Sequence, residues 1–380
     1  MFRRIFLQTL ILLMVLLAAC SPVSPSSLLF PTRTPTASAT TSFTNKPTPT
    51  LTPTILPTST IPPTRTPPPL PDLYQPSLLN PLDTPHTYLQ DTCQYLHDKW
   101  SLADSAPGTV VMAIMFHKIT NATITDPNEI SEYKFRRLMS LLHQDGFQAI
   151  TTLQLVGFLE HNSKIPERSA LLIADDKHSV DYFNGLFRQY WIDYGWPVVN
   201  AWISDNLTTS EIWKQQEGLN TEGWVDYQAH GVVSAPITSD SSDDYILGEL
   251  QGPLSVFRAH FNKTPIAFIW PGGGFTALAV ALAHQLGYRL GFTTNPRGPL
   301  MFNWVPLADA VDPARPTWIP EGGMNDPLMV LPRYWDTDAS LHLDEVIQIG
   351  REAAAFAQAY KPNELNYYDN ICLRTYGSLR

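Results

Sequence analysis

The sequence predicts an α/β protein with a parallel sheet and helices outside it, either a barrel or a doubly wound sheet. Apolar runs typical of buried strands alternate with segments of helical spacing between Val110 and Leu331. No glycine-rich turn follows the first strand-like run, which argues against a dinucleotide-binding domain. In a barrel, functional side chains gather where strands end. Polar residues stand there: His117, Asp175, Asp176, His230 and the turn Pro271–Gly274.

The first 20 residues have the three parts of an export signal. Arg3 and Arg4 precede an apolar stretch over 5–17, and Leu17-Ala18-Ala19-Cys20 follows. A transmembrane helix is the alternative, but the stretch is short for one, and small residues before a cysteine favour processing. The tetrapeptide resembles the lipobox of bacterial lipoproteins. That resemblance implies cleavage before Cys20, lipidation of its thiol and anchoring to the outer side of the bacterial cell membrane.

Residues 21–72 are rich in proline, threonine and serine. They hold few large apolar groups, and the first acid of this stretch is Asp72. Such a segment cannot bury enough surface to offset its chain entropy, so we expect a disordered, extended linker. Its predicted role is to hold the following domain away from the membrane.

The charge of the chain lies in the predicted domain. The whole chain has 25 basic and 35 acidic residues, and five of the basic ones precede residue 72. The remainder, 20 bases against 35 acids, gives a net charge of about −15. An acidic domain repels phosphate polymers, which excludes nucleic acid as a partner and leaves neutral or cationic glycans.

Two cysteines remain once Cys20 is lipidated. Cys93 and Cys372 lie near the two ends of the predicted domain, and an exported protein can keep a disulfide. A bridge joining the ends and a pair of buried thiols are both open interpretations.

The chain divides into an N-terminal extension (73–107), a main domain (108–340) and a C-terminal helix and tail (341–380). In the main domain we expect helices over Ser131–Gln144, Thr152–His161 and Thr276–Leu286. The expected strands are Val110–Phe116, Ala170–Ala174, Val198–Ile203, Val225–His230, Ile266–Trp270, Leu290–Thr294 and Met329–Leu331. Between 203 and 225 the pattern indicates only a polar stretch.

The adjacent acids Asp175 and Asp176 are the main indication of chemistry. Like charges side by side raise one pKa unless a cation or substrate relieves the repulsion. A carboxylate and a histidine can hold zinc and leave positions for water and substrate. The second acid can then take a proton from that water, which is metal-assisted hydrolysis. A solvated turn is the ordinary alternative for such a pair.

The order of the segments is more specific than any one of them. Between about 108 and 335 the chain resembles the polysaccharide deacetylase (NodB-homology) family. The resembling segments are Met115–Ile119 (family "MYHxI"), Phe135–Phe147 (the following helix and turn), Leu172–Asp176 ("TFDD"), Ala229–His230 (the start of "H-x-x-x-H"), Phe268–Gly272, Gly291–Thr293 and Leu331–Arg333 ("LPR").

This resemblance implies an incomplete seven- or eight-stranded (β/α) barrel that removes N- or O-acetyl groups from glycans. It implies Asp175 as catalytic base, and Asp176 and His230 as ligands of a divalent metal, with zinc expected. We also expect a catalytic role for His117. The turn Trp270, Pro271 and Gly272 is expected to face the substrate, where backbone N–H groups stabilise an oxyanion.

The sequence departs from the family pattern at two positions. Ser234 stands where the second histidine is expected, and Lys177 replaces the usual glycine after the acids. The Lys177 ammonium could neutralise either acid, and losing one ligand weakens metal affinity. His178 and His117 are candidates for the missing ligand. His342, beyond the last motif, is a candidate general acid.

Three functions remain open. The first is a metal-dependent hydrolase that removes acetyl groups from a cell-wall or surface polysaccharide, such as peptidoglycan. The second is a catalytically impaired, glycan-binding lipoprotein with the same fold, and a monomer is expected in either case. The third, a transporter's substrate-binding lipoprotein, fits the motif order poorly. Aromatic rings that could stack on sugars, or form the core, are Trp202, Trp224, Trp270, Trp304 and Trp318.

Overall fold

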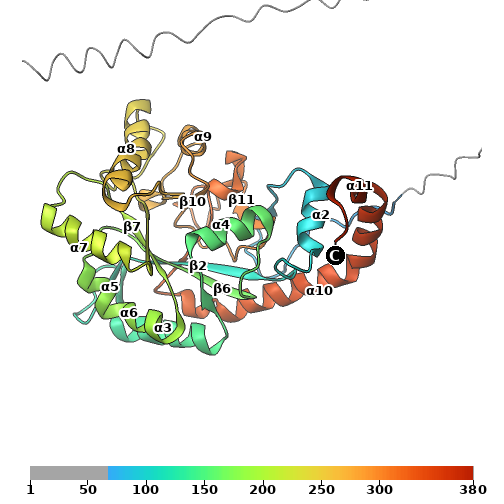
Figure 1. Ribbon diagram of the computed structural model, residues 1–380, viewed down its shortest axis with the longest axis horizontal. Coiled ribbons are helices and arrows are strands. Elements are labelled where there is room, and N and C mark those ends of the chain that lie inside the picture. Colours follow the sequence, from blue (N-terminus) through green and yellow to red (C-terminus); the bar gives the residue numbers. More distant parts are fainter. Residues whose placement is uncertain (1–66, 380) are drawn as a thin grey trace, which may run out of the picture. The chain divides into compact units, whose positions relative to one another are not determined.

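The computed structural model describes residues 67–379, so the predicted signal peptide, Cys20 and linker residues 21–66 lie outside the described part. Its main feature is a parallel sheet that winds in one direction (Figure 1). The strand order is β10 (Leu290–Phe292), β9 (Ala267–Ile269), β8 (Val225–Ala229), β7 (Val198–Trp202), β6 (Arg168–Ala174), β2 (Val110–Phe116) and β12 (Tyr334–Trp335), with β5 (Gln148–Ala149) also on β6. The strand order of a doubly wound sheet would reverse direction partway, so the predicted incomplete seven- or eight-stranded barrel is confirmed.

A short segment near the end of the domain spans the open side of this barrel. Leu331 forms a parallel bridge with Phe292 at the end of β10. Four residues on, Trp335 pairs with Met115 of β2. The predicted strand over Met329–Leu331 is wrong, because Pro327–Met329 is a 3-10 turn and the strand begins at Tyr334. Pro327 and Pro332 lack the N–H groups that a continuous ladder needs.

The predicted helices form where capping residues begin them. Ser131 caps α3 (Glu132–Gln144), and Thr151 and Gln154 form a capping box on α4 (Thr152–His161). Thr276 caps α9 (Ala277–Gln285). The structure adds helices that the sequence pattern did not predict: α5 (Val180–Leu186), α6 (Arg188–Tyr194), α7 (Ser210–Thr221) and α8 (Asp243–Phe261).

The sheet is buried on both faces. All seven residues of β2 are buried, as expected for a strand that reads as a continuous apolar run. Ile114 and Phe116 belong to one apolar cluster, with side chains of α3. Val111 and Ala113 belong to the other, with side chains of α4 and α9. The two clusters hold the carboxyl ends of the strands at one edge.

The extension and the C-terminal segment lie together. The extension contributes β1 (Asp83–His86), which pairs antiparallel with β11 (Val305–Ala308), and α2 (Thr92–Trp100). The long helix α10 (Leu343–Tyr367) passes β2 and reaches α2 and α11 (Leu373–Tyr376) (Figure 1). Smaller elements are β3 (Lys118–Thr120), β4 (Glu129–Ser131), the 3-10 turns Pro271–Gly273, Gly322–Met324 and Ala339–Leu341, and a π-helical turn over Tyr368–Cys372.

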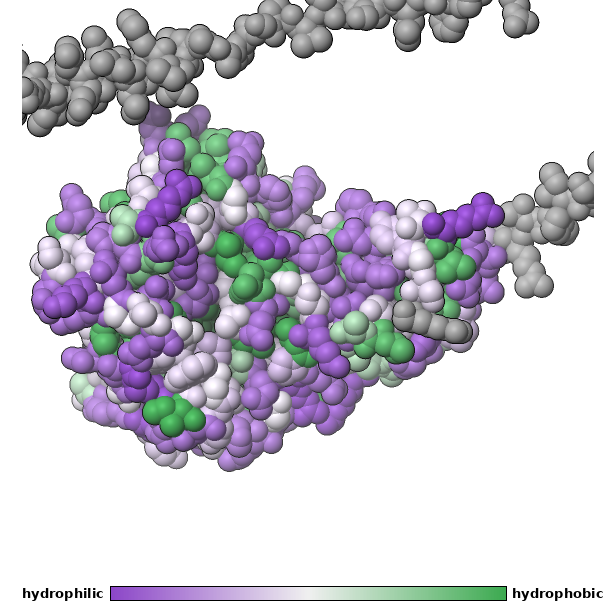
Figure 2. All heavy atoms as spheres, viewed as in Figure 1, coloured by the Kyte–Doolittle hydropathy of each residue, from purple (hydrophilic) through white to green (hydrophobic). Residues whose placement is uncertain are grey.

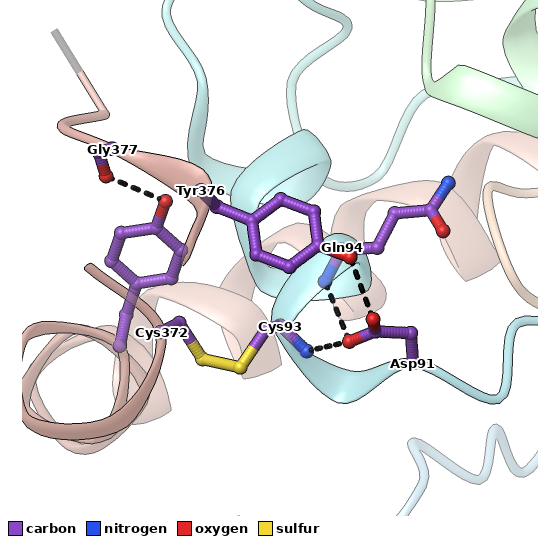
Figure 3. The surroundings of a disulfide bond; sticks show 7 residues. Asp91, Cys93, Gln94, Cys372, Tyr376 and Gly377 are labelled. Carbon is purple, nitrogen blue, oxygen red and sulfur yellow. Dashed lines mark hydrogen bonds between the residues drawn. A yellow bond between two sulfur atoms is a disulfide. The ribbon is translucent and has the colours of Figure 1, made fainter. Parts of the chain in front are cut away.

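A disulfide joins these two parts of the chain. Cys93 on α2 and Cys372 in the π-helical turn are bonded, 279 residues apart in sequence (Figure 3). Beside the bond, Asp91 accepts hydrogen bonds from the backbone N–H groups of Cys93 and Gln94 and from the Tyr376 hydroxyl. Of the two interpretations of these cysteines, the structure has the bridge.

On the face seen in Figure 2 the surface is mostly hydrophilic, and its apolar residues form separate small patches. Among residues 67–379, no helix combines the length and the apolar character needed to cross a membrane.

Candidate functional site

Asp175 is the buried centre of the site. It follows β6, and its backbone N–H donates to the carbonyl of Phe116 at the end of β2. Its carboxylate is 2% exposed and accepts two hydrogen bonds from the Arg333 guanidinium, at 2.6 and 2.9 Å. Burial would raise the pKa of Asp175, but Arg333, with His117 and His230, lowers it to about 2. Asp175 is therefore ionised at any physiological pH.

Arg333 owes its position to the way the barrel closes. It lies between Leu331, bridged to β10, and Tyr334, paired with β2. Its side chain is fully buried, and its Nε–H donates to the carbonyl of Thr293 at 2.7 Å. The guanidinium thus reaches Asp175 from the side of the barrel that this segment closes.

Asp176, the second acid, faces His230 across a short gap. Its backbone has a φ of +69°, and its side chain is 51% exposed, whereas Asp175 is buried. Its Oδ1 lies 3.7 Å from Nε2 of His230 and accepts a hydrogen bond from the Ser234 hydroxyl at 3.4 Å. The structure therefore brings together Asp176, His230 and the serine in the place of the expected histidine.

The hydrogen bonding of His230 determines which nitrogen faces Asp176. The ring is 3% exposed, and its Nδ1 is 2.8 Å from the carbonyl of Ile269, so Nδ1 carries the proton. Burial lowers the pKa of His230 against the opposing charges of Asp175 and Asp176. A neutral His230 then presents the Nε2 lone pair to a carboxylate oxygen. Two acceptors facing each other leave a place for a cation or a hydrogen-bond donor.

This donor set does not fit the three-ligand centre that a catalytic zinc requires. Asp176 and His230 are two suitable ligands, but the hydroxyl of Ser234 is a neutral and weak third donor. In the described part of the chain, no three His, Cys, Asp or Glu side chains are grouped closely enough to share a metal ion. His117 and His178 therefore do not complete the set in this conformation.

His117 stands on the other side of Asp175. Its Nε2 is 3.7 Å from Oδ2 of Asp175. Its ring stacks on the indole of Trp335, with centroids 5.2 Å apart and planes 11° apart. The Trp335 Nε1–H donates to the carbonyl of Thr294, which holds the indole in place. His117 is partly exposed, so it can contact both Asp175 and a ligand.

An acid that the sequence did not single out lies behind His117. The Asp336 backbone N–H donates to the carbonyl of Met115. Within residues 67–379, neither of its buried carboxylate oxygens has a hydrogen-bond partner. Burial, with the nearby charges of Asp175 and Asp338, raises the pKa of Asp336 to about 8. Asp336 is therefore mostly protonated at neutral pH.

Lys177 does not neutralise the acid pair. Its ammonium lies 2.7 Å from Oδ1 of Asp205 and 5.5 Å from the centroid of the Trp202 ring. The loop after β7 therefore takes up the lysine charge. The expectation that Lys177 pairs with Asp175 or Asp176 is corrected by this contact.

The predicted substrate turn is mostly buried. Trp270 is fully buried, and its indole N–H donates to the carbonyl of Met329. Pro271 is buried too, while Gly272 is exposed with a φ of +56°. The backbone N–H groups of Gly273 and Gly274 donate within the turn. Of the three predicted residues, only Gly272 can meet a ligand in this conformation.

The other candidates have partners away from the acids. The Nδ1 of His342 is 3.0 Å from a carboxylate oxygen of Glu345 on α10. The ring of His178 stacks on Tyr182, with centroids 3.7 Å apart. Of the five tryptophans that could stack on sugars, Trp318 is only partly buried. The other four are core residues: Trp202, Trp224, Trp270 and Trp304.

Sequence reasoning gave no role to Arg333, Trp335 and Asp336. The "LPR" segment marked the place of Arg333, but nothing local indicated its partner 158 residues earlier. A tryptophan and an acid directly after a short apolar segment were the available signal.

No model of a known protein family matches the chain, and no curated protein matches it. Among solved structures it is similar to the Streptococcus pyogenes deacetylase PplD in complex with acetate, with 17% identity, a TM-score of 0.49, and coverage of 64% of this chain and 99% of that one. A polysaccharide deacetylase from Bacillus cereus has 16% identity and a TM-score of 0.48, covering 63% and 69%. IcaB from Ammonifex degensii has 14% identity and a TM-score of 0.46, covering 64% and 98%.

Identities and TM-scores this low carry no conclusion about activity, ligand or metal. The strand order itself gives the chain the incomplete parallel (β/α) barrel that the family resemblance of the sequence motifs implies.

Proposed function

We propose that this protein is a hydrolase that removes acetyl groups from a cell-wall or surface polysaccharide. The observation that carries the proposal is the convergence of two acids and two histidines where β2, β6 and β8 end, together with a buried arginine just before β12. Hydrolysis of an amide or ester needs a base and an acid. Here these are Asp175 and His117, and the partly exposed carboxylate of Asp176 lies beside them.

The proposed roles follow the contacts. Asp175, ionised and held by Arg333, is the base, and its pKa of about 2 makes it a weak one that holds a proton only briefly. His117, which stacks on Trp335, is the proposed donor of a proton to the leaving group. Asp176 and His230 contact the acetyl group or the water that attacks it. The family resemblance implies a divalent metal, zinc, on Asp176 and His230, but the hydroxyl of Ser234 does not complete a three-ligand centre, so no step proposed here depends on a metal.

The setting of this activity is also proposed. The lipobox-like tetrapeptide ending at Cys20 and the proline-rich linker support a lipoprotein on the outer side of the bacterial cell membrane, acting as a monomer on nearby glycan. The acidic domain supports a neutral or cationic glycan rather than an anionic polymer.

Acetate release tests the proposal. The full-length protein is incubated with acetylated chitooligosaccharides and with peptidoglycan fragments, with zinc present in the buffer, and free acetate is measured. Asp175→Asn should lower the rate by about 100-fold or more. The control is Asp226→Asn. Asp226 lies at the amino end of β8, where its carboxylate pairs with the Lys263 ammonium, and this variant should keep the wild-type rate.

A second candidate is favoured by the incomplete donor set, which in residues 67–379 has two strong ligands and a serine. This candidate is a glycan-binding lipoprotein without catalysis. Binding of the same oligosaccharides without acetate release, unchanged in Asp175→Asn, would establish it and reject the hydrolase.

A further inference from the structure

The loop after β8 holds Ser234 against Asp176 in a defined conformation. This loop, residues 230–234, begins at His230, whose Nδ1–H is committed to the carbonyl of Ile269. It ends at Ser234, whose hydroxyl donates to Oδ1 of Asp176. The same carboxylate oxygen therefore faces both ends of the loop.

A buried acid on α8 supports this loop from behind. Glu249 is 3% exposed, and its Oε2 accepts hydrogen bonds from the backbone N–H groups of Val232 and Val233, at 2.8 and 3.2 Å. Gly231 has a φ of +72°, and a Cβ at this residue would collide with Oε2 of Glu249. Glu249 and Gly231 thus support the loop conformation through contacts within the protein.

The loop also fixes the direction of residue 234. Ser234 has a φ of +52°, a left-handed conformation that is uncommon for a residue with a side chain. It places the side chain 3.4 Å from the oxygen that Nε2 of His230 also faces. A nitrogen or carboxylate ligand at this position would stand beside the other two donors.

Zinc sites that persist through dilution have at least three charged or imidazole protein ligands. Here the third place carries a neutral hydroxyl that is already engaged as a donor to Asp176. In the described residues no other His, Cys, Asp or Glu takes that place. The donor set therefore does not fit a permanently bound metal ion. The loop conformation, however, would accept a third ligand at position 234.

We infer that this centre does not retain a divalent metal, and that Ser234 alone is the reason. The loop presents position 234 to Asp176 and His230, so that Ser234→His converts a weak, exchangeable two-ligand site into a tight three-ligand site. This inference concerns the same residues as the proposed function, but it is tested by metal content and affinity rather than by turnover.

The test is zinc binding by the full-length protein. Wild type, Ser234→His, Ser234→Ala and the double variant His230→Ala/Ser234→His are loaded with equimolar zinc and passed through a desalting column, and their zinc is measured by mass spectrometry. Ser234→His should keep about one zinc per chain, and the other three should keep little. Zinc titration calorimetry should show at least about 100-fold tighter binding by Ser234→His than by wild type.

Two results would overturn the inference. The first is wild type retaining about one zinc per chain after the desalting column, because a third ligand must then come from elsewhere. The second is Ser234→His with unchanged circular dichroism and melting temperature but wild-type zinc affinity, because the loop then does not present position 234. Acetate release is measured on the same samples: tight zinc binding by Ser234→His with no acetate from any sample would reject the proposed hydrolase and leave this inference standing.

Discussion

The carboxylate of Asp175 and the guanidinium of Arg333 form a two-point ion pair, with both residues almost entirely removed from solvent. A buried pair of this kind is costly to break, because the residue left behind keeps its charge without a partner. Since Arg333 also binds the carbonyl of Thr293, the pair connects β6 to the segment that closes the barrel.

Removing Arg333 should therefore destabilise the domain strongly. Arg333→Met leaves Asp175 buried and unpaired, and we expect a loss of about 3–5 kcal/mol in the free energy of unfolding, measured with urea. The control Arg289→Met breaks a more exposed pair with Glu160 and should cost about 1 kcal/mol or less. Adding Asp175→Asn to Arg333→Met should recover part of the loss. Equal costs for the two arginines would contradict this account.

Asp336 should make stability fall with rising pH. Its pKa rises from 3.8 to about 8 on folding, so the native state keeps a proton that the unfolded state releases. This contribution is complete below about pH 4 and is lost as the pH rises to about 8. Asp336→Asn cannot titrate. Its free energy of unfolding should therefore rise relative to that of wild type across this window, by on the order of a few kcal/mol. Urea unfolding at pH 5 and pH 8.5 measures the gain, and a difference independent of pH would refute the prediction.

Gly231 and Gly195 form a matched pair for the loop after β8. Both have a φ of +72°, but a Cβ at Gly195 has nothing within 4 Å, whereas one at Gly231 meets Glu249. Gly195→Ala should cost about 1 kcal/mol, the ordinary cost of a left-handed alanine. Gly231→Ala should cost clearly more and should displace the loop, which amide chemical shifts of Val232 and Val233 would report. Similar losses in the free energy of unfolding at the two sites would show that the Glu249 side chain moves aside at little cost.

The disulfide between Cys93 and Cys372 should stabilise the contact between the two ends of the domain. It closes a long loop, so Cys93→Ser/Cys372→Ser should lower the free energy of unfolding by roughly 2–4 kcal/mol. In a strong reductant, which breaks the disulfide, the melting temperature of wild type should fall to that of the double variant. If proteolysis of the reduced protein begins elsewhere than in α2 and α11, the bridge does not hold these segments together.

The local elements could be predicted because short-range patterns determine them. The apolar run Val110–Phe116 is β2 with the same bounds, and the helical spacing and caps of Thr152–His161 give α4 with the same bounds. The last strand could not be placed, because Pro327 and Pro332 interrupt its pattern and only pairing with β2 defines it. The helices α7 and α8 also escaped prediction, since apolar residues alone did not mark them.

By itself the sequence determined the alternating strands and helices and the acids and histidines at the strand ends, because the period of apolar residues fixes strands and helices. The strand order of the structure then decided for the barrel over a doubly wound sheet. The sequence also determined that the third ligand position is Ser234. Only the tertiary structure decided the partners: Arg333 for Asp175, Asp205 for Lys177, and Trp335 for His117. The physical reason is that these pairings depend on how the barrel closes and its loops fold back, which no local pattern encodes.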